Sequence, residues 1–153
     1  DYLRTYVRFV GDDDVYLAEG ISRETFDRDA DEWRDALILT FDLDAVDKLV
    51  INDREFTKHG TGWFVREREI EFVKVIEVLN LLSNLRAMGF AEKVSVFEPV
   101  IVVSIISHAF SHGVEIGEKQ DTYLYLLRVT GKKPVFLVNE YIVEQILGLL
   151  HDS

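Results

Sequence analysis

The chain contains no cysteine and only two prolines among its 153 residues. Without cysteine it has no disulfide, no thiolate metal site and no cysteine nucleophile. This absence fits a reducing cytoplasm and equally an exported bacterial protein that needs no disulfides, so it leaves the compartment open. Pro99 and Pro134 lie far apart, and no stretch rich in glycine and serine interrupts the sequence. We therefore expect a single domain over residues 1–153.

Long apolar runs and positive charge are also scarce. The longest apolar run, Val100–Ile106, is far shorter than the roughly 20 residues that a membrane-spanning helix requires. There are 17 lysines and arginines against 28 acidic residues, which gives a net charge of −11. No run of basic residues along the sequence offsets this charge. Because such a field repels phosphate backbones and anionic lipids, we expect no nucleic-acid partner.

What is present is typical of a folded protein, since 48% of the residues are hydrophobic and 12% are aromatic. Runs rich in β-branched and aromatic residues predict strands. Thr5–Val10 and Val15–Ala18 flank the turn sequence GDDD and predict a hairpin. Further strand-like runs are Ala36–Phe41, Ala45–Asn52, Arg54–Gly60, Gly62–Glu67, Val100–Ser107, Val114–Gly117, Tyr123–Val129 and Pro134–Val138.

Three segments predict helices. Glu69–Met88 is the longest, because its apolar residues recur at helical spacing and polar residues line the other side. Glu140–Leu150 predicts a closing helix that buries Ile142, Ile146 and Leu149, and Ser22 is a candidate N-cap for a short helix over Ser22–Phe26. Strands and helices do not alternate regularly. We therefore expect an α+β fold with a mostly antiparallel sheet, one long helix and one or two shorter ones.

The two ends of the chain carry similar sequences. TYVRFVGDDDVYLAEG at Thr5–Gly20 aligns without a gap on YLLRVTGKKPVFLVNE at Tyr125–Glu140, 120 positions later. Each copy is followed by a predicted helix. The pattern predicts an internal hairpin–helix repeat, with one unit over residues 1–26 and a complete unit over residues 45–150. The matched pairs are Arg8 with Arg128, Gly11 with Gly131, Val15 with Val135, Tyr16 with Phe136 and Leu17 with Leu137.

The acidic segment DRDADEWRD is the best candidate for a calcium site. Asp27, Asp29, Asp31 and Asp35 stand where an EF-hand loop has ligands. However, Glu32 takes the place of the turn glycine, and Ile38 takes the place of the bidentate glutamate. We therefore favour a solvated acidic loop.

Two histidines and two tryptophans are the other candidates. His108 and His112 are four residues apart, which on a helix would suit zinc, but the β-branched residues around them favour a strand end and a turn. Trp63 and Trp33 are both candidates for stacking on a sugar or anchoring a partner, but Trp63 alternates with Val65 and is expected in the core. No nucleophile motif and no glycine-rich phosphate loop occurs. The sequence therefore assigns no catalytic, cofactor-binding or metal-binding residue.

Several segments, in order along nearly the whole chain, resemble the bacterial family called domain of unknown function 4340. They are YVRFVGDDDVYLAEG, WRDALILTFDLDAVDKLVI, HGTGWFV, VIEVLNLLSNLRAMGF, GVEIGEK and YLLRVTGKKPVFLVNE. The resemblance implies a duplicated α+β module outside the cytoplasm of a bacterium, membrane-anchored and often accompanying an ABC-type transport system. It implies no enzymatic activity and carries over no catalytic residue. The chain starts at Asp1 within a strand pattern, so we expect a longer parent protein with a further unit and a membrane anchor upstream.

From these observations we expect a non-enzymatic interaction or scaffolding domain with protein partners, among them membrane transport components. Self-association through an exposed strand edge is a further expectation. The alternative is a soluble module that binds a glycan or a peptide in a cleft between the two hairpin–helix units. An apolar surface patch would favour the first function. A cleft lined by exposed aromatic residues, or a carboxylate with a strongly shifted pKa, would favour the second or an enzyme.

Overall fold

The computed structural model describes residues 4–8, 11, 13–20, 36–91, 94 and 96–151. The chain divides into two compact units, Asp1–Arg34 and Asp35–Ser153. The predicted helix at Ser22–Phe26, the acidic segment from Asp27 to Asp35, and Trp33 lie outside the described residues. The fold class is confirmed as α+β with a mostly antiparallel sheet.

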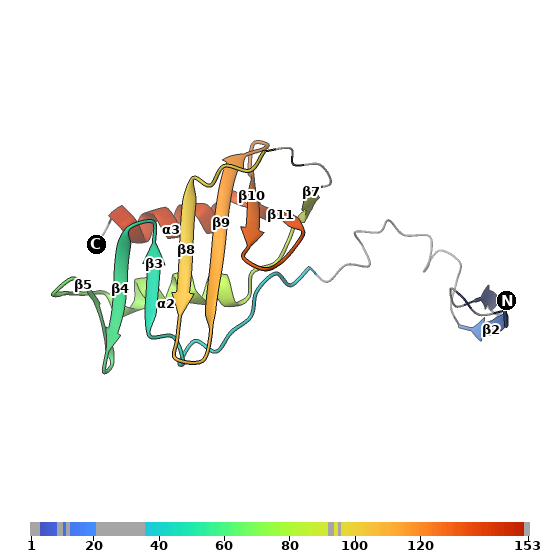
Figure 1. Cartoon of the computed structure of the whole chain (residues 1–153), viewed down its shortest axis with the longest axis horizontal. Coiled ribbons are helices and arrows are strands. Elements are labelled where there is room, and N and C mark those ends of the chain that lie inside the picture. Colours follow the sequence, from blue (N-terminus) through green and yellow to red (C-terminus); the bar gives the residue numbers. More distant parts are fainter. Residues whose placement is uncertain are drawn as a thin grey trace. The chain divides into compact units, whose positions relative to one another are not determined.

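The described residues of the larger unit form a nine-stranded sheet with two helices on the same side of it (Figure 1). The strand order is β6-β5-β4-β3-β8-β9-β10-β11-β7, and every neighbouring pair is antiparallel. The strands are β3 (Lys48–Ile51), β4 (Arg54–His59), β5 (Gly62–Val65), β6 (Arg68–Ile70), β7 (Gly89–Ala91), β8 (Ile101–Ile106), β9 (Ser111–Lys119), β10 (Leu124–Val129) and β11 (Val135–Asn139); the helices are α2 (Phe72–Ser83) and α3 (Glu140–His151).

The sequence patterns explain which face of each element is buried. Along β8, Ile101, Val103 and Ile105 are buried whereas the residues between them are not, as period-two alternation requires. In α2 the buried apolar residues follow the i, i+3, i+4, i+7 spacing of an amphipathic helix. Sheet and helices bury one core between them: Ile38, Leu39, Val46, Leu49, Ile51, Phe56, Trp63, Val75, Val78, Leu79, Leu82, Leu85, Ile101, Val103, Ile105, Val114, Ile116, Leu127, Val129, Phe136, Val138, Val143, Ile146 and Leu149.

The helices are shorter than the periodicity predicts. The segment expected to be one helix over Glu69–Met88 gives β6 and then α2, because Glu69 and Ile70 pair with β5. The helix ends at Ser83, beyond which Arg86 forms an isolated bridge with Leu37. That bridge is the only ladder pairing found between 36 and 41, where a strand was expected. Both described helices have 12 residues, so the expected long helix is not seen.

The connection from β7 to β8 crosses to the middle of the sheet, since β7 lies beside β11 and β8 lies between β3 and β9. Arg128 lies between two buried core residues of β10, so its side chain points to the face opposite the helices. The ring of Phe97, in the connection, lies against Arg128 and Gly117. Phe97 thereby holds this part of the crossover on the sheet face that the helices leave open.

The smaller unit contains the predicted N-terminal hairpin, with β1 at Arg4–Val7 and β2 at Tyr16–Glu19. Its register equals that of the β10–β11 hairpin when 120 is added to each number: Thr5 pairs with Ala18 as Tyr125 pairs with Val138. Gly11 and Gly131 both have positive φ, 90° and 83°. The hairpins therefore agree position by position, while the full repeat stays a prediction because Ser22–Phe26 is not described.

No helix among the described residues is long and apolar enough to cross a membrane.

Candidate functional site

The two candidate zinc ligands have separate neighbours. The backbone N–H of His108 donates to Asp47 Oδ2 at 3.0 Å, and the His108 Nδ1 atom lies 3.8 Å from the same oxygen. His112 instead stacks on Phe110, with 5.0 Å between the ring centres. His108 lies in the loop after β8 and His112 lies in β9, so the predicted strand end and turn are confirmed.

Metal-binding groups are not gathered elsewhere in the part of the chain that the structure describes. There, no three histidine or acidic side chains come close enough together to hold an ion. Of the positions where an EF-hand loop has ligands, only that of the closing glutamate, here Ile38, is described. It is fully buried, and its backbone N–H donates to the carbonyl of Leu85 at 2.7 Å. Whether the acidic segment binds calcium stays untested.

Trp63 belongs to the core, as predicted. Its side chain is fully buried on β5. The indole N–H has no hydrogen-bond partner within the described structure, which is unusual for a buried donor. Because the ring is enclosed, Trp63 is not available for stacking on a sugar.

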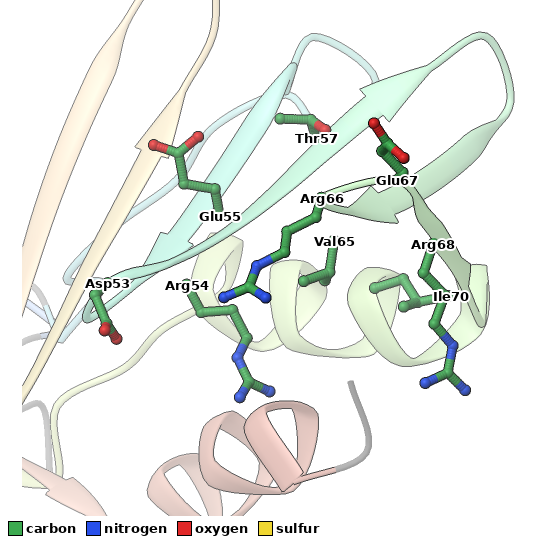
Figure 2. Close-up of a pocket in the computed structure, with 9 residues that line it drawn as sticks. All are labelled: Asp53, Arg54, Glu55, Thr57, Val65, Arg66, Glu67, Arg68 and Ile70. Atoms are coloured by element: carbon green, nitrogen blue, oxygen red, sulfur yellow. The ribbon is translucent and has the colours of Figure 1, made fainter.

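One groove lies at the end of the sheet formed by β4, β5 and β6 (Figure 2). It has a volume of about 890 Å³. Charged side chains of both signs line most of it, over the apolar side chains of Val65 and Ile70. The lining residues are Asp53, Arg54, Glu55, Thr57, Val65, Arg66, Glu67, Arg68 and Ile70. We call this the arginine groove.

Three guanidinium groups define the chemistry of the arginine groove. Arg54 donates from Nη1 to the carbonyl oxygen of Leu150, near the C-terminal end of α3. Arg66 is the first residue of the two-residue turn between β5 and β6 and has φ 57°, a conformation that non-glycine residues rarely adopt. Arg68 opens β6 opposite Val65. The β5–β6 turn thus places Arg66 and Arg68 in the same groove as Arg54, which is hydrogen-bonded to the C-terminal end of α3.

Two of the three acidic residues of the arginine groove point away from the arginines, whereas the carboxylate of Asp53 points to the same side as the guanidinium group of Arg54. In Figure 2 the carboxylates of Glu55 and Glu67 point away from the side on which the three guanidinium groups lie. Glu55 also has its own cation, since Lys48 Nζ donates to it at 3.1 Å. The charges of the six charged lining residues sum to zero, and in Figure 2 the three guanidinium groups point toward α3. The sequence indicated no basic cluster, because these arginines come together only through the β3–β4 and β5–β6 turns.

A second groove is predominantly apolar and lies between the C-terminal end of α2 and the N-terminal end of α3. It has a volume of about 380 Å³. Two large apolar side chains on its rim are exposed, Met88 at 63% and Tyr141 at 54%. The lining residues are Asn80, Leu81, Asn84, Leu85, Arg86, Met88, Asn139, Tyr141 and Ile142. We call this the helix groove.

Hydrogen bonds fix the walls of the helix groove. The Asn84 side chain donates to the carbonyl oxygen of Asn80 at 3.1 Å and so ends α2. Asn139 Oδ1 accepts from the backbone N–H of Tyr141 at 2.8 Å at the start of α3. Sequence analysis missed this groove, although polar asparagines next to apolar helix residues at both helix ends were a visible signal.

One ion pair lies beside the helix groove. Lys119 donates to the carboxylate of Glu140, the residue before Tyr141, and its ammonium group lies 5.7 Å from the centre of the Tyr125 ring. The hydrogen bond from Glu140 raises the pKa of Lys119, with a smaller opposing effect from desolvation. The pair joins the end of β9 to the start of α3.

Comparison with known proteins gives one finding. The family model described as "Domain of unknown function (DUF4340)" matches residues 1–100, which is more than half of the chain. No curated protein and no solved structure matches the chain.

Proposed function

The chain belongs to the DUF4340 family, and we propose that it is a non-enzymatic interaction or scaffolding domain that binds a protein partner through the helix groove. In this proposal the domain lies outside the cytoplasm, in a membrane-anchored protein associated with an ABC-type transport system. The resemblance of the segments quoted above supports the location and the transport association.

The single observation that carries the binding function is the exposed apolar rim of the helix groove. Met88 and Tyr141 keep more than half of their surface in water, although the core beside them is well packed. Tyrosine and methionine are enriched at protein interfaces, where a large side chain fills a pocket of the partner. Asn80 and Asn139 offer amide groups next to this apolar surface. An apolar surface with a few fixed polar groups fits a protein partner.

Site-specific crosslinking in cells tests this function. A photoreactive amino acid at position 141 or 88 is expected to capture a component of a membrane transport system. Lys133, an exposed residue in the β10–β11 turn, provides the control position. The proposal fails if positions 141 and 88 capture nothing, or capture the same proteins as position 133.

The location has a separate test. Alkaline phosphatase folds to an active enzyme only where its disulfides form, so a fusion of it to the natural protein reports the compartment. We expect an active fusion. An inactive fusion with normal abundance contradicts the extracytoplasmic location, and it leaves the crosslinking result to decide the interaction function.

The arginine groove favours a second function, a ligand-binding module for a peptide. Guanidinium groups bind carboxylates in a bidentate manner, and three of them spread along a groove with an apolar floor suit an extended acidic peptide. No aromatic side chain lines the groove, so it offers a glycan no stacking surface.

Titration with a hexaglutamate peptide tests this second function. Arg66→Gln and Arg68→Gln should each weaken binding roughly tenfold or more, since a charged hydrogen bond contributes about 1.5–3 kcal/mol. Lys133→Gln removes the same charge elsewhere and should leave binding unchanged. Hexaglutamine should not bind, and equal binding by all three variants would exclude the groove as the site.

A further inference from the structure

The lining of the helix groove carries no negative charge. None of its nine lining residues is acidic, although 28 of the 153 residues of the chain are. Its one charged residue is Arg86, which is exposed. Glu140 lies beside the groove and is paired with Lys119. The two helix ends that form the walls carry partial charges of opposite sign, so the formal charge of Arg86 makes the site cationic.

The backbone around Arg86 is fixed, while its side chain remains available to a ligand. The next residue, Ala87, donates its backbone N–H to the carbonyl oxygen of Ala36 at 2.7 Å. Met88 donates its own to the carbonyl oxygen of Leu137 at 2.8 Å. Among the described residues, the guanidinium group of Arg86 forms no hydrogen bond or ion pair. A ligand can therefore bind this cation without first breaking a contact within the described structure, and a fixed backbone lowers the entropy cost of binding.

Two asparagine side chains of the helix groove complement a peptide backbone. Asn139 Oδ1 accepts from the Tyr141 backbone N–H, which leaves the amide nitrogen of Asn139 as a donor. Asn84 Nδ2 instead donates to the carbonyl oxygen of Asn80 and to Ser83 Oγ, which leaves its oxygen as an acceptor. A peptide backbone carries one donor and one acceptor in each residue, whereas a hydrocarbon chain carries none. One amide that donates and one that accepts therefore favour an extended peptide segment.

The size of the groove and the range of its charge limit which segment fits. A volume of about 380 Å³ has room for a few side chains, because ligand pockets span roughly 300–1,000 Å³. The net charge of −11 repels acidic ligands at long range. However, exposed charges more than about 8 Å apart are largely screened at physiological ionic strength. Arg86, in direct contact with the ligand, therefore determines which charge is bound.

We propose that the partner segment bound in the helix groove is extended and carries a carboxylate side chain next to a large apolar one. Arg86 pairs with the carboxylate, and the apolar side chain lies against Met88 and Ile142. Asn84 and Asn139 bind the backbone of the segment. This inference rests on the proposed function, because it names the chemistry of the partner that the helix groove binds.

Met88 provides the probe for a binding test, because it is the only methionine among the 153 residues. Carbon-13 labelling of methionine methyl groups should give one NMR signal, which reports on the rim of the groove. The ligands are the peptide acetyl-Gly-Leu-Glu-Leu-Gly-amide and its two analogues with Gln or Lys in place of Glu. We expect the Glu peptide to bind best. The Gln peptide should bind roughly threefold more weakly, as the loss of an exposed ion pair predicts, and the Lys peptide more weakly still.

Charge variants assign this preference to one residue. Arg86→Glu should reverse the order, so that the Lys peptide binds best, and Arg86→Gln should remove the preference for charge. Lys133→Glu makes the same change of charge in an exposed turn and should keep the natural order. The inference is overturned if the natural chain binds the three peptides equally or binds none. It is also overturned if Lys133→Glu changes the order as Arg86→Glu does.

Crosslinking from position 141 in cells separates this inference from the function on which it rests. We expect Arg86→Glu to lower the capture of the partner severalfold and Lys133→Glu to leave it unchanged. If position 141 captures nothing, the proposed function fails, and the peptide titration still decides the preference for a carboxylate. Equal capture by Arg86→Glu and the natural chain keeps the function and overturns the inference. Capture of a second copy of this chain also overturns it, because the groove would then be a dimer contact.

Discussion

The guanidinium carbon of Arg128 lies 4.6 Å from the ring centre of Phe97. This contact joins the crossover before β8 to the middle of the sheet. Gly117 makes the approach possible, because a Cβ atom there would lie 3.2 Å from Phe97 Cε2 and 3.4 Å from the carbonyl oxygen of Glu98. The contact between Arg128 and Phe97, together with the absence of a side chain at Gly117, positions the crossover on the sheet face that the helices leave open.

Gly117→Ala should therefore destabilise the protein by about 1–3 kcal/mol, the usual range for overpacking a close contact. Urea unfolding measures the change. In a Phe97→Ala background the same substitution should cost clearly less, because the ring that the new methyl group meets is gone. Equal costs in both backgrounds would show that Phe97 does not restrict position 117.

Trp63 offers a second prediction, since its ring fills the core while its N–H has no partner. Trp63→Ala should cost about 3–5 kcal/mol through the cavity it leaves. Trp63→Phe should cost much less, because it keeps most of the apolar volume and removes an unsatisfied donor whose burial costs about 1–3 kcal/mol. Urea unfolding of both variants provides the measurement. If Phe is as costly as Ala, the indole N–H has a partner in solution.

Asn52 lies in the β3–β4 turn with φ 55°, and its Oδ1 atom accepts from the Val102 backbone N–H at 2.9 Å. Asn52→Gly keeps the conformation and loses the hydrogen bond, so it should cost about 0.5–1.5 kcal/mol. Asn52→Ala loses the same hydrogen bond and also places an alanine in a left-handed conformation. It should therefore cost about 1–2 kcal/mol more than Asn52→Gly. Thermal unfolding followed by circular dichroism distinguishes the two. The reverse order would contradict the strained turn.

Lys119 predicts an alkaline pH dependence. Its hydrogen bond with Glu140 raises the pKa above the ordinary 10.5. A group whose pKa is raised by folding stabilises the protein fully below its unfolded pKa, and this contribution is lost as pH rises through the folded pKa. The midpoint difference between the natural chain and Lys119→Gln should thus be constant up to about pH 9 and shrink above about pH 10.5. Lys133→Gln, at an exposed turn, should show no such change. A constant difference over the whole range would refute the coupling.

The sequence by itself determined the fold class and most strands. A run of β-branched residues places β8, and alternation of Trp63 with Val65 places the tryptophan in the core, because one face of each strand is buried. The gapless match between the chain ends predicted two similar hairpins, and their equal registers agree with it.

Tertiary structure alone decided the short strands, the crossover and both grooves. β6 and β7 have three residues each, too few for an alternating pattern to be recognised in the sequence. They form because the edges of β5 and β11 are available for pairing. The sequence predicted a helix over Glu69–Met88, but α2 is shorter at both ends. On the N-terminal side, Glu69 and Ile70 pair with β5, and on the C-terminal side Arg86 bridges Leu37. At both ends, long-range backbone hydrogen bonds replace those of the helix. Arg54, Arg66 and Arg68 line one groove because two tight turns, between β3 and β4 and between β5 and β6, bring their strands together. No local sequence pattern predicts this proximity.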